Sequence, residues 1–442
     1  MNLRAKTLGS KTLGRRAFLA AAMASVAAPA LVRLARADTP RVLLKLHHPF
    51  SSVSSGHDKF LAPWARQVEA QSGGRIRIDI FPSMQLGGQP AQLFDQARTG
   101  FADIVWAAPS RTPGRFPRLE VFELPFVASR RALVSSKAIQ DYAAANLTDE
   151  LRDIHPICLS CADRGVIHAN RPVQTIAEMK GLRLQVQTRY AGDAVRALGA
   201  YAVAMPSAQL PAAFTERVVD GCVDPWALVP SLRLDDLFKA HTDFAESSLS
   251  TETFVLAMNK ASYDKLPADL KTVLDNNSGQ VAAAMAGTMW DLQADAVANM
   301  VAQRGAPITT LMPEAVAHWR KATEPVIEAW QKRMKEQRTD GGKLLADAQA
   351  MLQKYAAEPE PQPPPTAPPQ PAEPSVAAKP GQGREANADL TATPASPAPA
   401  QASQSAAAKS APLPSAAATP PPAVPKPAPA AASPPKILDI PL

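Results

Sequence analysis

The ten residues Phe81-Pro-Ser-Met-Gln-Leu-Gly-Gly-Gln-Pro90 decide how the fold of this chain is interpreted. They close a strand predicted over residues 75–81, in which apolar and polar side chains alternate with period two. A short helix is predicted over 92–99, and a buried strand over 104–106. Together with a strand predicted over 41–46, this βαβ order indicates an α/β fold with a mainly parallel sheet and helices on both faces.

A second set of alternating elements starts after Cys161. Strands are predicted over 179–186 and 201–206, helices over 190–198 and 208–219, and a loop over 221–226. A strand over 251–259 is expected to return to the first set, and helices follow over 267–304, 313–338 and 342–356. Residues 38–357 are enough for two lobes with separate cores. Ligands of such sheets bind at the carboxyl ends of strands.

The first 37 residues are typical of an export signal. Gly14-Arg-Arg-Ala-Phe-Leu19 looks like a twin-arginine motif, an apolar run follows it, and Ala35-Arg-Ala37 is typical of a cleavage site. The alternative is an amphipathic helix of a cytosolic protein, and the absence of acidic residues before Asp38 argues against it. Because the segment has no lipobox cysteine, we expect a periplasmic protein without a lipid anchor.

The positive charge of the chain belongs to that segment. The formal net charge is +7, and residues 1–37 contain seven Lys and Arg with no Asp or Glu. The remaining chain therefore has a formal net charge of zero. This balance gives no reason to expect binding to nucleic acid or to an anionic membrane.

Residues 358–442 have a different composition, rich in Pro, Ala, Ser and Gln. They contain 24 of the 44 prolines and almost no aromatic residues. Such a segment buries too little apolar area to offset its ordering entropy, so we expect a disordered, extended tail. Its tip, Lys436-Ile-Leu-Asp-Ile-Pro-Leu442, is either an accidental terminus or a peptide that docks an unknown partner.

The order of several motifs resembles a known family. Phe81-Pro, Gln85-Leu-Gly87, a helix, Gly100-Phe-Ala-Asp103 and Leu124-Pro-Phe126 follow one another in the first half. In the second half stand Glu178-Met-Lys-Gly-Leu-Arg-Leu-Gln-Val186, Leu198-Gly-Ala200 and Val219-Asp-Gly221. This series resembles the extracytoplasmic solute-binding proteins of TRAP transporters, the DctP-like family, over residues 41–340.

The resemblance implies a two-lobe periplasmic binding protein that closes on its ligand about a hinge. We expect lobe I to contain residues 38–162 and 251–290, and lobe II residues 163–250 and 291–357. The implied function is capture of a small organic acid and its delivery to membrane permease subunits, without a cofactor, a metal or catalysis. The alternative is a binding module that presents its solute to a sensor.

Position 185 departs from the family pattern. Most members carry an arginine there that pairs with a substrate carboxylate, because a guanidinium donates two parallel bonds. Gln185 brings no charge, so either a neighbouring arginine supplies it or the ligand is not a simple carboxylate. Arg164 and Arg189 are the candidates, and the alternative for both is an exposed surface position.

Three further residues are candidates for the cleft between the lobes. Asp224 stands where many members carry Asn, and it would repel an anion unless it pairs with an arginine or a cation. Its alternative role is a turn residue before Pro225. Trp226 and Trp106 would form aromatic walls for the ligand, while plain core packing is the alternative for Trp106.

His48 is expected to act as a hydrogen-bond donor in the cleft. His47 and His48 point to opposite faces of a strand, so they cannot both reach one metal ion, and no metal site is expected. Cys158-Leu-Ser-Cys161 is a CxxC motif, but in a predicted strand its two thiols face opposite sides. We therefore expect no disulfide and no redox activity from this motif.

Overall fold

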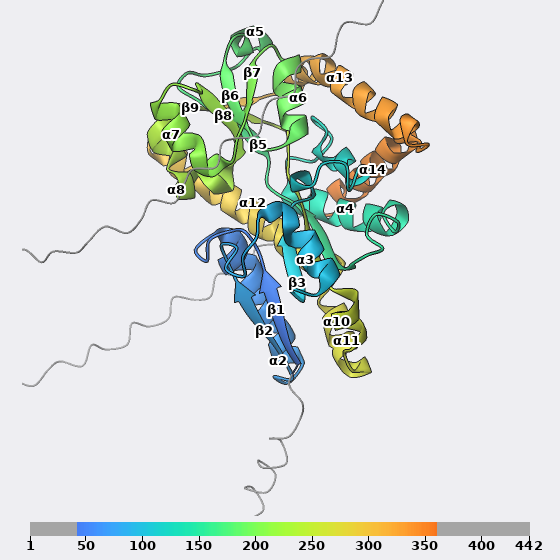
Figure 1. The fold of residues 1–442 in the computed structure, drawn as a ribbon. Helices are drawn as coiled ribbons and strands as arrows, with labels where there is room; N and C mark the ends of the chain where they lie inside the picture. Colours follow the sequence, from blue (N-terminus) through green and yellow to red (C-terminus); the bar gives the residue numbers. More distant parts are fainter. Residues whose placement is uncertain (1–41, 360–442) are drawn as a thin grey trace, which may run out of the picture. The chain divides into compact units, whose positions relative to one another are not determined.

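The structure is a computed structural model that describes residues 42–359. The predicted export signal over 1–37 and the predicted tail beyond residue 359 lie outside the described residues. Within 42–359 the strands form two sheets, which crossing segments and a long helix connect (Figure 1). No helix in this range combines the length and the apolar composition that crossing a membrane requires.

The first sheet has the strand order β2-β1-β3-β10-β4. Its strands are β1 (Val42–His47), β2 (Ile76–Phe81), β3 (Ile104–Ala107), β4 (His155–Cys161) and β10 (Thr253–Met258). β1 runs parallel to β2 and β3, and β10 runs antiparallel to β3 and β4. The helices on this sheet are α2 (Ala62–Gln71), α3 (Leu93–Thr99) and α4 (Ala132–Asn146). Full burial of Phe60, Trp64 and Val68 agrees with their helical spacing.

The second sheet has the order β11-β9-β5-β8-β6-β7. Its strands are β5 (Gly165–Ala169), β6 (Arg183–Val186), β7 (Tyr201–Ala204), β8 (Gly221–Pro225), β9 (Ala240–Phe244) and β11 (Ile308–Leu311). The helices in this part of the chain are α5 (Ile176–Met179), α6 (Arg189–Ala197), α7 (Leu210–Thr215), α8 (Val229–Leu232) and α9 (Leu234–Leu237). The expected two-lobe α/β fold is confirmed. Both sheets are mixed, because the strands next to the crossing segments pair antiparallel.

The prediction of a loop over 221–226 is wrong. Residues 221–225 form β8, which lies between β5 and β6 inside the second sheet. The strand is buried on both faces, so it has no alternating pattern that would reveal it. Gly221 is required there because a Cβ atom would lie 2.4 Å from the carbonyl oxygen of His168.

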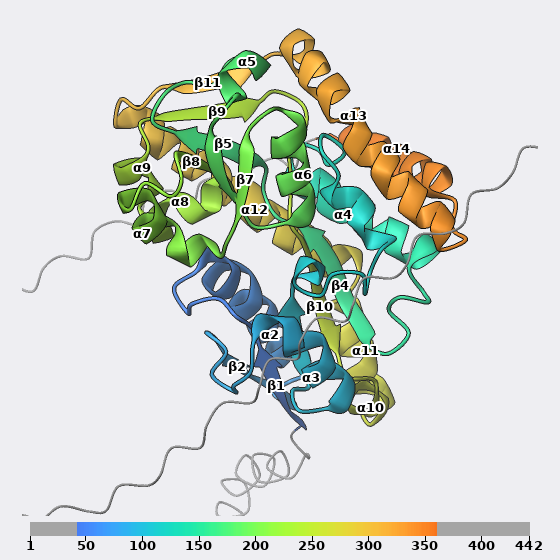
Figure 2. The same cartoon turned by 45° about the horizontal axis from the view of Figure 1, so that its top comes forward.

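Helix α12 (Gln280–Gln303) contributes to a core in each lobe. Ala282, Ala286 and Trp290 pack in the core of the first sheet, and Ala294 and Val301 pack in a core of the second. Figures 1 and 2 show the helix running from one sheet to the other. Short helices α10 (Lys260–Asp264) and α11 (Ala268–Asn276) precede it. A single rigid element therefore spans both lobes.

The last two helices, α13 (Pro313–Glu336) and α14 (Gly341–Ala356), form a pair that returns to the first sheet (Figure 2). Leu344, Ala348 and Leu352 of α14 lie in the same core as Tyr142 of α4. This packing differs from the expected membership of residues 291–357 in lobe II, because the apolar face of α14 is buried against α4. We propose to count α14 with lobe I, and the other expected lobe boundaries stay predictions.

Candidate ligand site between the lobes

The two lobes meet at the carboxyl ends of β3 and β6. A short 3-10 turn, Pro109–Arg111, follows β3, and Gln187 follows β6. Arg111 Nη2 donates a hydrogen bond of 2.9 Å to Gln187 Oε1, which joins lobe I to lobe II. Arg111 Nη2 also lies 3.3 Å from Glu252 Oε1, and Ser110 Oγ donates to the same oxygen at 2.8 Å. Strand ends of this kind are where α/β sheets bind ligands.

Hydrogen bonds continue from Gln187 into lobe II. Gln187 Nε2 donates to Asp224 Oδ1 at 2.7 Å, and Ser207 Oγ donates to the same carboxylate at 3.0 and 3.1 Å. Gln185 Nε2 donates to the carbonyl oxygen of Met205 at 2.8 Å and to Ser207 Oγ at 3.3 Å. We name this set the bridging network; it consists of Arg111, Gln185, Gln187, Ser207, Asp224 and Glu252.

Asp224 is a buried acid with neutral partners. Its side chain is fully buried on β8, and burial raises its pKa to about 7, while the hydrogen bonds from Gln187 and Ser207 oppose the shift. An ionised carboxylate here would repel an anionic ligand unless an arginine or a cation paired with it. An amide and a hydroxyl stand beside it instead, and burial favours the protonated form.

A small cavity lies beside the bridging network, between the segment after β3 and helix α6. Ser110, Phe116, Glu120, Glu123, Arg189 and Tyr190 are among the residues that line it. Its volume of about 30 Å³ accepts a water-sized group but not a ring compound. A larger ligand therefore requires the lobes to separate or the lining side chains to move.

Tyr190 of lobe II and Glu123 of lobe I are buried polar side chains that line this cavity. The Tyr190 hydroxyl of α6 contacts the carboxylate of Glu120 in lobe I and the guanidinium of Arg333 in α13. Glu123 accepts hydrogen bonds from the backbone and the hydroxyl of Thr253 at 3.1 and 2.7 Å. Burial raises the pKa of Glu123 to about 8, so this carboxyl is mainly protonated at neutral pH.

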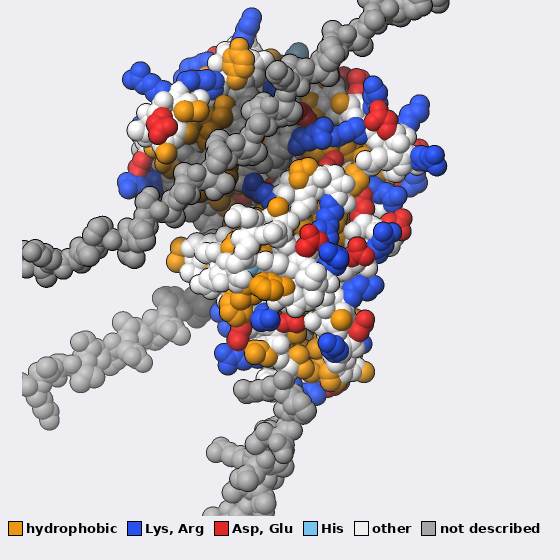
Figure 3. Space-filling model, viewed as in Figure 1, with side chains coloured by type: hydrophobic (Ala, Val, Ile, Leu, Met, Phe, Trp, Pro, Cys, Tyr) orange, Lys and Arg blue, Asp and Glu red, His pale blue; other side chains and the backbone are white. Residues whose placement is uncertain are grey.

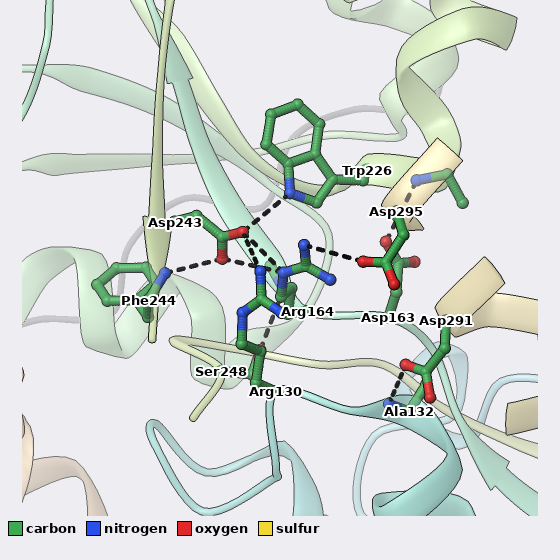
Figure 4. Close-up of polar contacts among 12 residues, drawn as sticks. Arg130, Ala132, Asp163, Arg164, Trp226, Asp243, Phe244, Ser248, Asp291 and Asp295 are labelled. Atoms are coloured by element: carbon green, nitrogen blue, oxygen red, sulfur yellow. Dashed lines mark hydrogen bonds and ion pairs between the residues drawn. The ribbon is translucent and has the colours of Figure 1, made fainter. Parts of the chain in front are cut away.

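Arg164 and Trp226 lie in a second polar group at the crossing segments, shown in Figure 4. Arg164 Nε donates to both oxygens of Asp243 at 3.0 and 2.8 Å, and Trp226 Nε1 donates to Asp243 at 3.3 Å. Arg130 reaches the same carboxylate at 3.2 Å. We name Arg130, Asp163, Arg164, Trp226, Asp243 and Asp295 the hinge cluster.

The exposed-surface alternative is wrong for Arg164, whose side chain is only 2% exposed. The other predicted arginine, Arg189, is 60% exposed, and its nearest acid is Asp193 at 3.7 Å. Asp163 accepts a hydrogen bond from the backbone of Ala227 at 3.2 Å, and burial raises its pKa to about 8. The two arginines thus occupy very different environments.

Trp106 and His48 pack in the core of lobe I. Trp106 is fully buried and its ring contacts Phe50 and Phe254 at centroid distances of 5.0 and 4.8 Å. The backbone amide of Phe50 donates to His48 Nδ1, so the proton of His48 is on Nε2, which lies 2.9 Å from His57 Nδ1. Burial lowers the pKa of His48 to about 3. Its one donor is therefore already used inside the protein.

The seven predicted residues thus divide among several places. The structure brings Gln185 together with Asp224, and Arg164 together with Trp226, while Arg189 lines the cavity. Sequence reasoning missed Arg111, Gln187 and Ser207. Gln187 directly follows the strand predicted over 179–186, and Arg111 lies in the turn after the strand predicted over 104–106. The rule that ligands bind at the carboxyl ends of strands could therefore have found them.

The side chains of Cys158 and Cys161 face opposite sides of β4, as their spacing in a strand predicts. Both are free and buried, and they pack in the cores on opposite faces of the first sheet. Burial raises the pKa of the Cys158 thiol to about 12, which makes it unreactive at neutral pH. Within residues 42–359 no three His, Cys, Asp or Glu side chains are grouped to hold a metal ion.

Basic and acidic side chains are interspersed on the face shown in Figure 3. This agrees with the balanced charge of the chain after residue 37.

Comparison with known proteins identifies the family. The model of bacterial extracellular solute-binding protein family 7, DctP, matches residues 48–333. A protein called y4mM from Sinorhizobium fredii is 27% identical over 326 residues, which are 71% of this chain and 57% of that protein. The chain thus spans just over half the length of that relative.

Two solved structures have a similar fold. A TRAP solute-binding protein from Rhodoferax ferrireducens, in complex with copurified benzoate, is 36% identical with a TM-score of 0.68. The match covers 71% of this chain and 98% of that one. A marine metagenome TRAP solute-binding protein, co-crystallised with 3-hydroxybenzoate, is also 36% identical with a TM-score of 0.68 and coverages of 72% and 99%. This chain belongs to the DctP family of TRAP-type solute-binding proteins.

Proposed function

We propose that this chain captures a small organic acid between its two lobes and delivers it to the membrane subunits of a TRAP transporter. The observation that carries the proposal is the bridging network, in which Arg111 of lobe I is bonded to Gln187 of lobe II at the carboxyl ends of two strands. A ligand held there would contact both lobes and stabilise their closure.

The ligand class that we favour is an aromatic monocarboxylic acid. Two relatives that are 36% identical were crystallised with benzoate and 3-hydroxybenzoate, and one that is 25% identical with mandelate. In this chain the rings of Phe116 and Tyr190 line the cavity beside the bridging network. Aromatic side chains favour a ring in the ligand.

Gln185 remains a proposed ligand residue, together with Asp224 and Arg189. Gln185 Oε1 is buried and accepts no hydrogen bond from any residue of 42–359. An unpaired buried acceptor is costly, so it would favour a ligand with a hydrogen-bond donor such as a hydroxyl group. We also propose that residues 1–37 direct the chain to the periplasm and that it acts by binding rather than by catalysis.

The test is a thermal-shift and calorimetry panel on the chain without residues 1–37. At about 100 times Kd, a ligand adds about 2.7 kcal/mol of stability, which raises Tm by roughly 4 °C for a folded part of this size. We expect such shifts with benzoate, 3-hydroxybenzoate or mandelate, and none with succinate. Small-angle scattering should show compaction with the same ligand. A panel without any acid that shifts Tm would contradict the proposal.

A further inference from the structure

We propose that Arg111 binds the carboxylate of the ligand and that Gln187 holds its guanidinium in position. The positive charge that the family strand carries at position 185 would then come from the opposite lobe. This inference rests on the proposed function, since it assumes an acid as ligand. The missing charge then comes from an arginine in the turn after β3.

The guanidinium of Arg111 has unused donors. Its Nη2 is bonded to Gln187 and lies near Glu252, whereas Nε and Nη1 make no hydrogen bond to any residue of 42–359. The side chain is 31% exposed, so it is neither sealed in a core nor fully solvated. Nε and Nη1 lie on different edges of the guanidinium, so each can donate to a carboxylate oxygen. A two-bond contact would combine one of them with the second N–H of Nη2.

The two arginines that were predicted from the sequence are less suitable. Arg164 is buried and its Nε is bonded to both oxygens of Asp243, which neutralises its charge. Arg189 has free donors, but its side chain is 60% exposed, and water weakens a charge pair there. Arg111 combines partial burial, free donors and a place at the carboxyl end of β3.

Gln187 is suited to position Arg111 without neutralising it. Its amide oxygen accepts from Arg111 and its amide nitrogen donates to Asp224, so both ends of the side chain are fixed. A carboxylate at this position would instead form an ion pair with Arg111 and compete with the ligand. Glu252 is the one acid within 4 Å of Arg111 among the described residues, and it also accepts from Ser110.

The experiment compares benzoate with its neutral analogue benzamide by calorimetry. Because a truncated charge pair in a partly buried site costs about 2 kcal/mol or more, Arg111→Gln should weaken benzoate binding by about 30-fold or more. Benzamide binding should change little, so the preference for the acid disappears. Gln187→Glu should weaken benzoate binding as well, while Arg111→Lys keeps the charge, loses the fork and should be intermediate.

The controls separate binding from folding. Arg196→Gln removes an exposed arginine of α6 and should leave both affinities unchanged, and thermal melts establish that each variant is folded. If Arg111→Gln keeps the preference for benzoate, or if Arg189→Gln removes it instead, the inference is wrong while the proposed function stands. If the wild-type protein binds no acid at all, the proposed function fails and this inference fails with it.

Discussion

The bridging network and the hinge cluster each contain arginine and buried acid, yet they differ in how the arginine is paired. Arg164 in the hinge cluster is 2% exposed and bonded to the carboxylate of Asp243. Arg111 in the bridging network is 31% exposed, donates its one hydrogen bond among the described residues to the neutral amide of Gln187 and forms a single ion pair, with Glu252 at 3.3 Å. Residue type alone therefore does not identify a ligand arginine, whereas its partner and its free donors do.

The two regions also differ in the property that should change when their arginine is removed. Removing one member of a buried ion pair leaves an uncompensated charge, and this destabilises the folded state. Removing a partly exposed arginine with free donors should mainly affect a negatively charged ligand. Stability and affinity are thus separate measurements that can distinguish a hinge cluster from a ligand site.

The largest effect is expected for Arg164→Ala. Asp243 would stay buried with Arg130 as its one ion-pair partner among the described residues, so the free energy of unfolding should fall by about 3–5 kcal/mol. Urea unfolding followed by circular dichroism measures this change. The double variant Arg164→Met with Asp243→Leu removes both charges and should recover most of the stability. Equal stability of Arg164→Ala and wild type would show that the ion pair does not form.

The second prediction concerns the pH dependence of Asp224→Asn. The pKa of Asp224 is raised from 3.8 to about 7 in the folded state, so the folded protein binds this proton more tightly than the unfolded chain does. In the wild type this acid therefore makes stability fall as pH rises from about 4 to 7, and the effect is constant above 7. Asn cannot ionise, so the variant should lose this part of the slope.

The effect of Asp224 is measured as the difference in stability between wild type and Asp224→Asn, because other buried acids titrate in a similar pH range. Burial also raises the pKa of Glu123 and Asp163 to about 8 in both proteins. Stability measured at pH 5 and pH 8 should show Asp224→Asn gaining relative to wild type at the higher pH, by a few kcal/mol. Parallel curves would mean that Asp224 is ionised throughout.

A smaller effect is expected for Gln185→Ala. If Gln185 contacts the ligand, as predicted from its place in the strand, affinity should fall roughly ten-fold through the loss of one or two hydrogen bonds. The variant also removes the bonds to Met205 and Ser207, so its free energy of unfolding must be measured alongside. Lower stability with unchanged affinity would restrict Gln185 to a structural role.

Much of the fold could be predicted from the sequence because its elements have local signals. The alternation over 75–81 predicted β2, and the helical pattern over 313–338 predicted α13. β8 could not be predicted in this way, because a strand buried on both faces shows no alternation. The packing of α14 on α4 depends on contacts between distant segments, which no local pattern contains.

The site was harder to predict than the fold. Motif spacing singled out Gln185 and Asp224, which do lie in one network. The partner of each arginine is a tertiary property, since Asp243 and Arg164 are 79 residues apart in the sequence. Gln187 and Arg111 are 76 residues apart, so the bond that joins the lobes could not be read from either segment alone.

The smallest effect is expected for Tyr190→Phe, which tests the contacts between the lobes without altering an arginine. The hydroxyl of Tyr190 contacts Glu120 of lobe I, so its removal should lower the free energy of unfolding by about 1 kcal/mol. Tyr201→Phe is the matched control, because Tyr201 is 67% exposed on β7 and should tolerate the change.

The same variant should also shift the unliganded protein toward an open state. The bond from Arg111 to Gln187 remains, so closure is weakened rather than lost, and ligand affinity should fall by no more than about three-fold on the scale of one hydrogen bond. Small-angle scattering should show a larger radius of gyration for unliganded Tyr190→Phe than for Tyr201→Phe, and equal radii once ligand is bound. Equal radii without ligand, together with unchanged stability, would mean that the hydroxyl of Tyr190 does not hold the lobes together in solution. Closure would then depend on the arginines, which makes the difference between Arg111 and Arg164 more decisive.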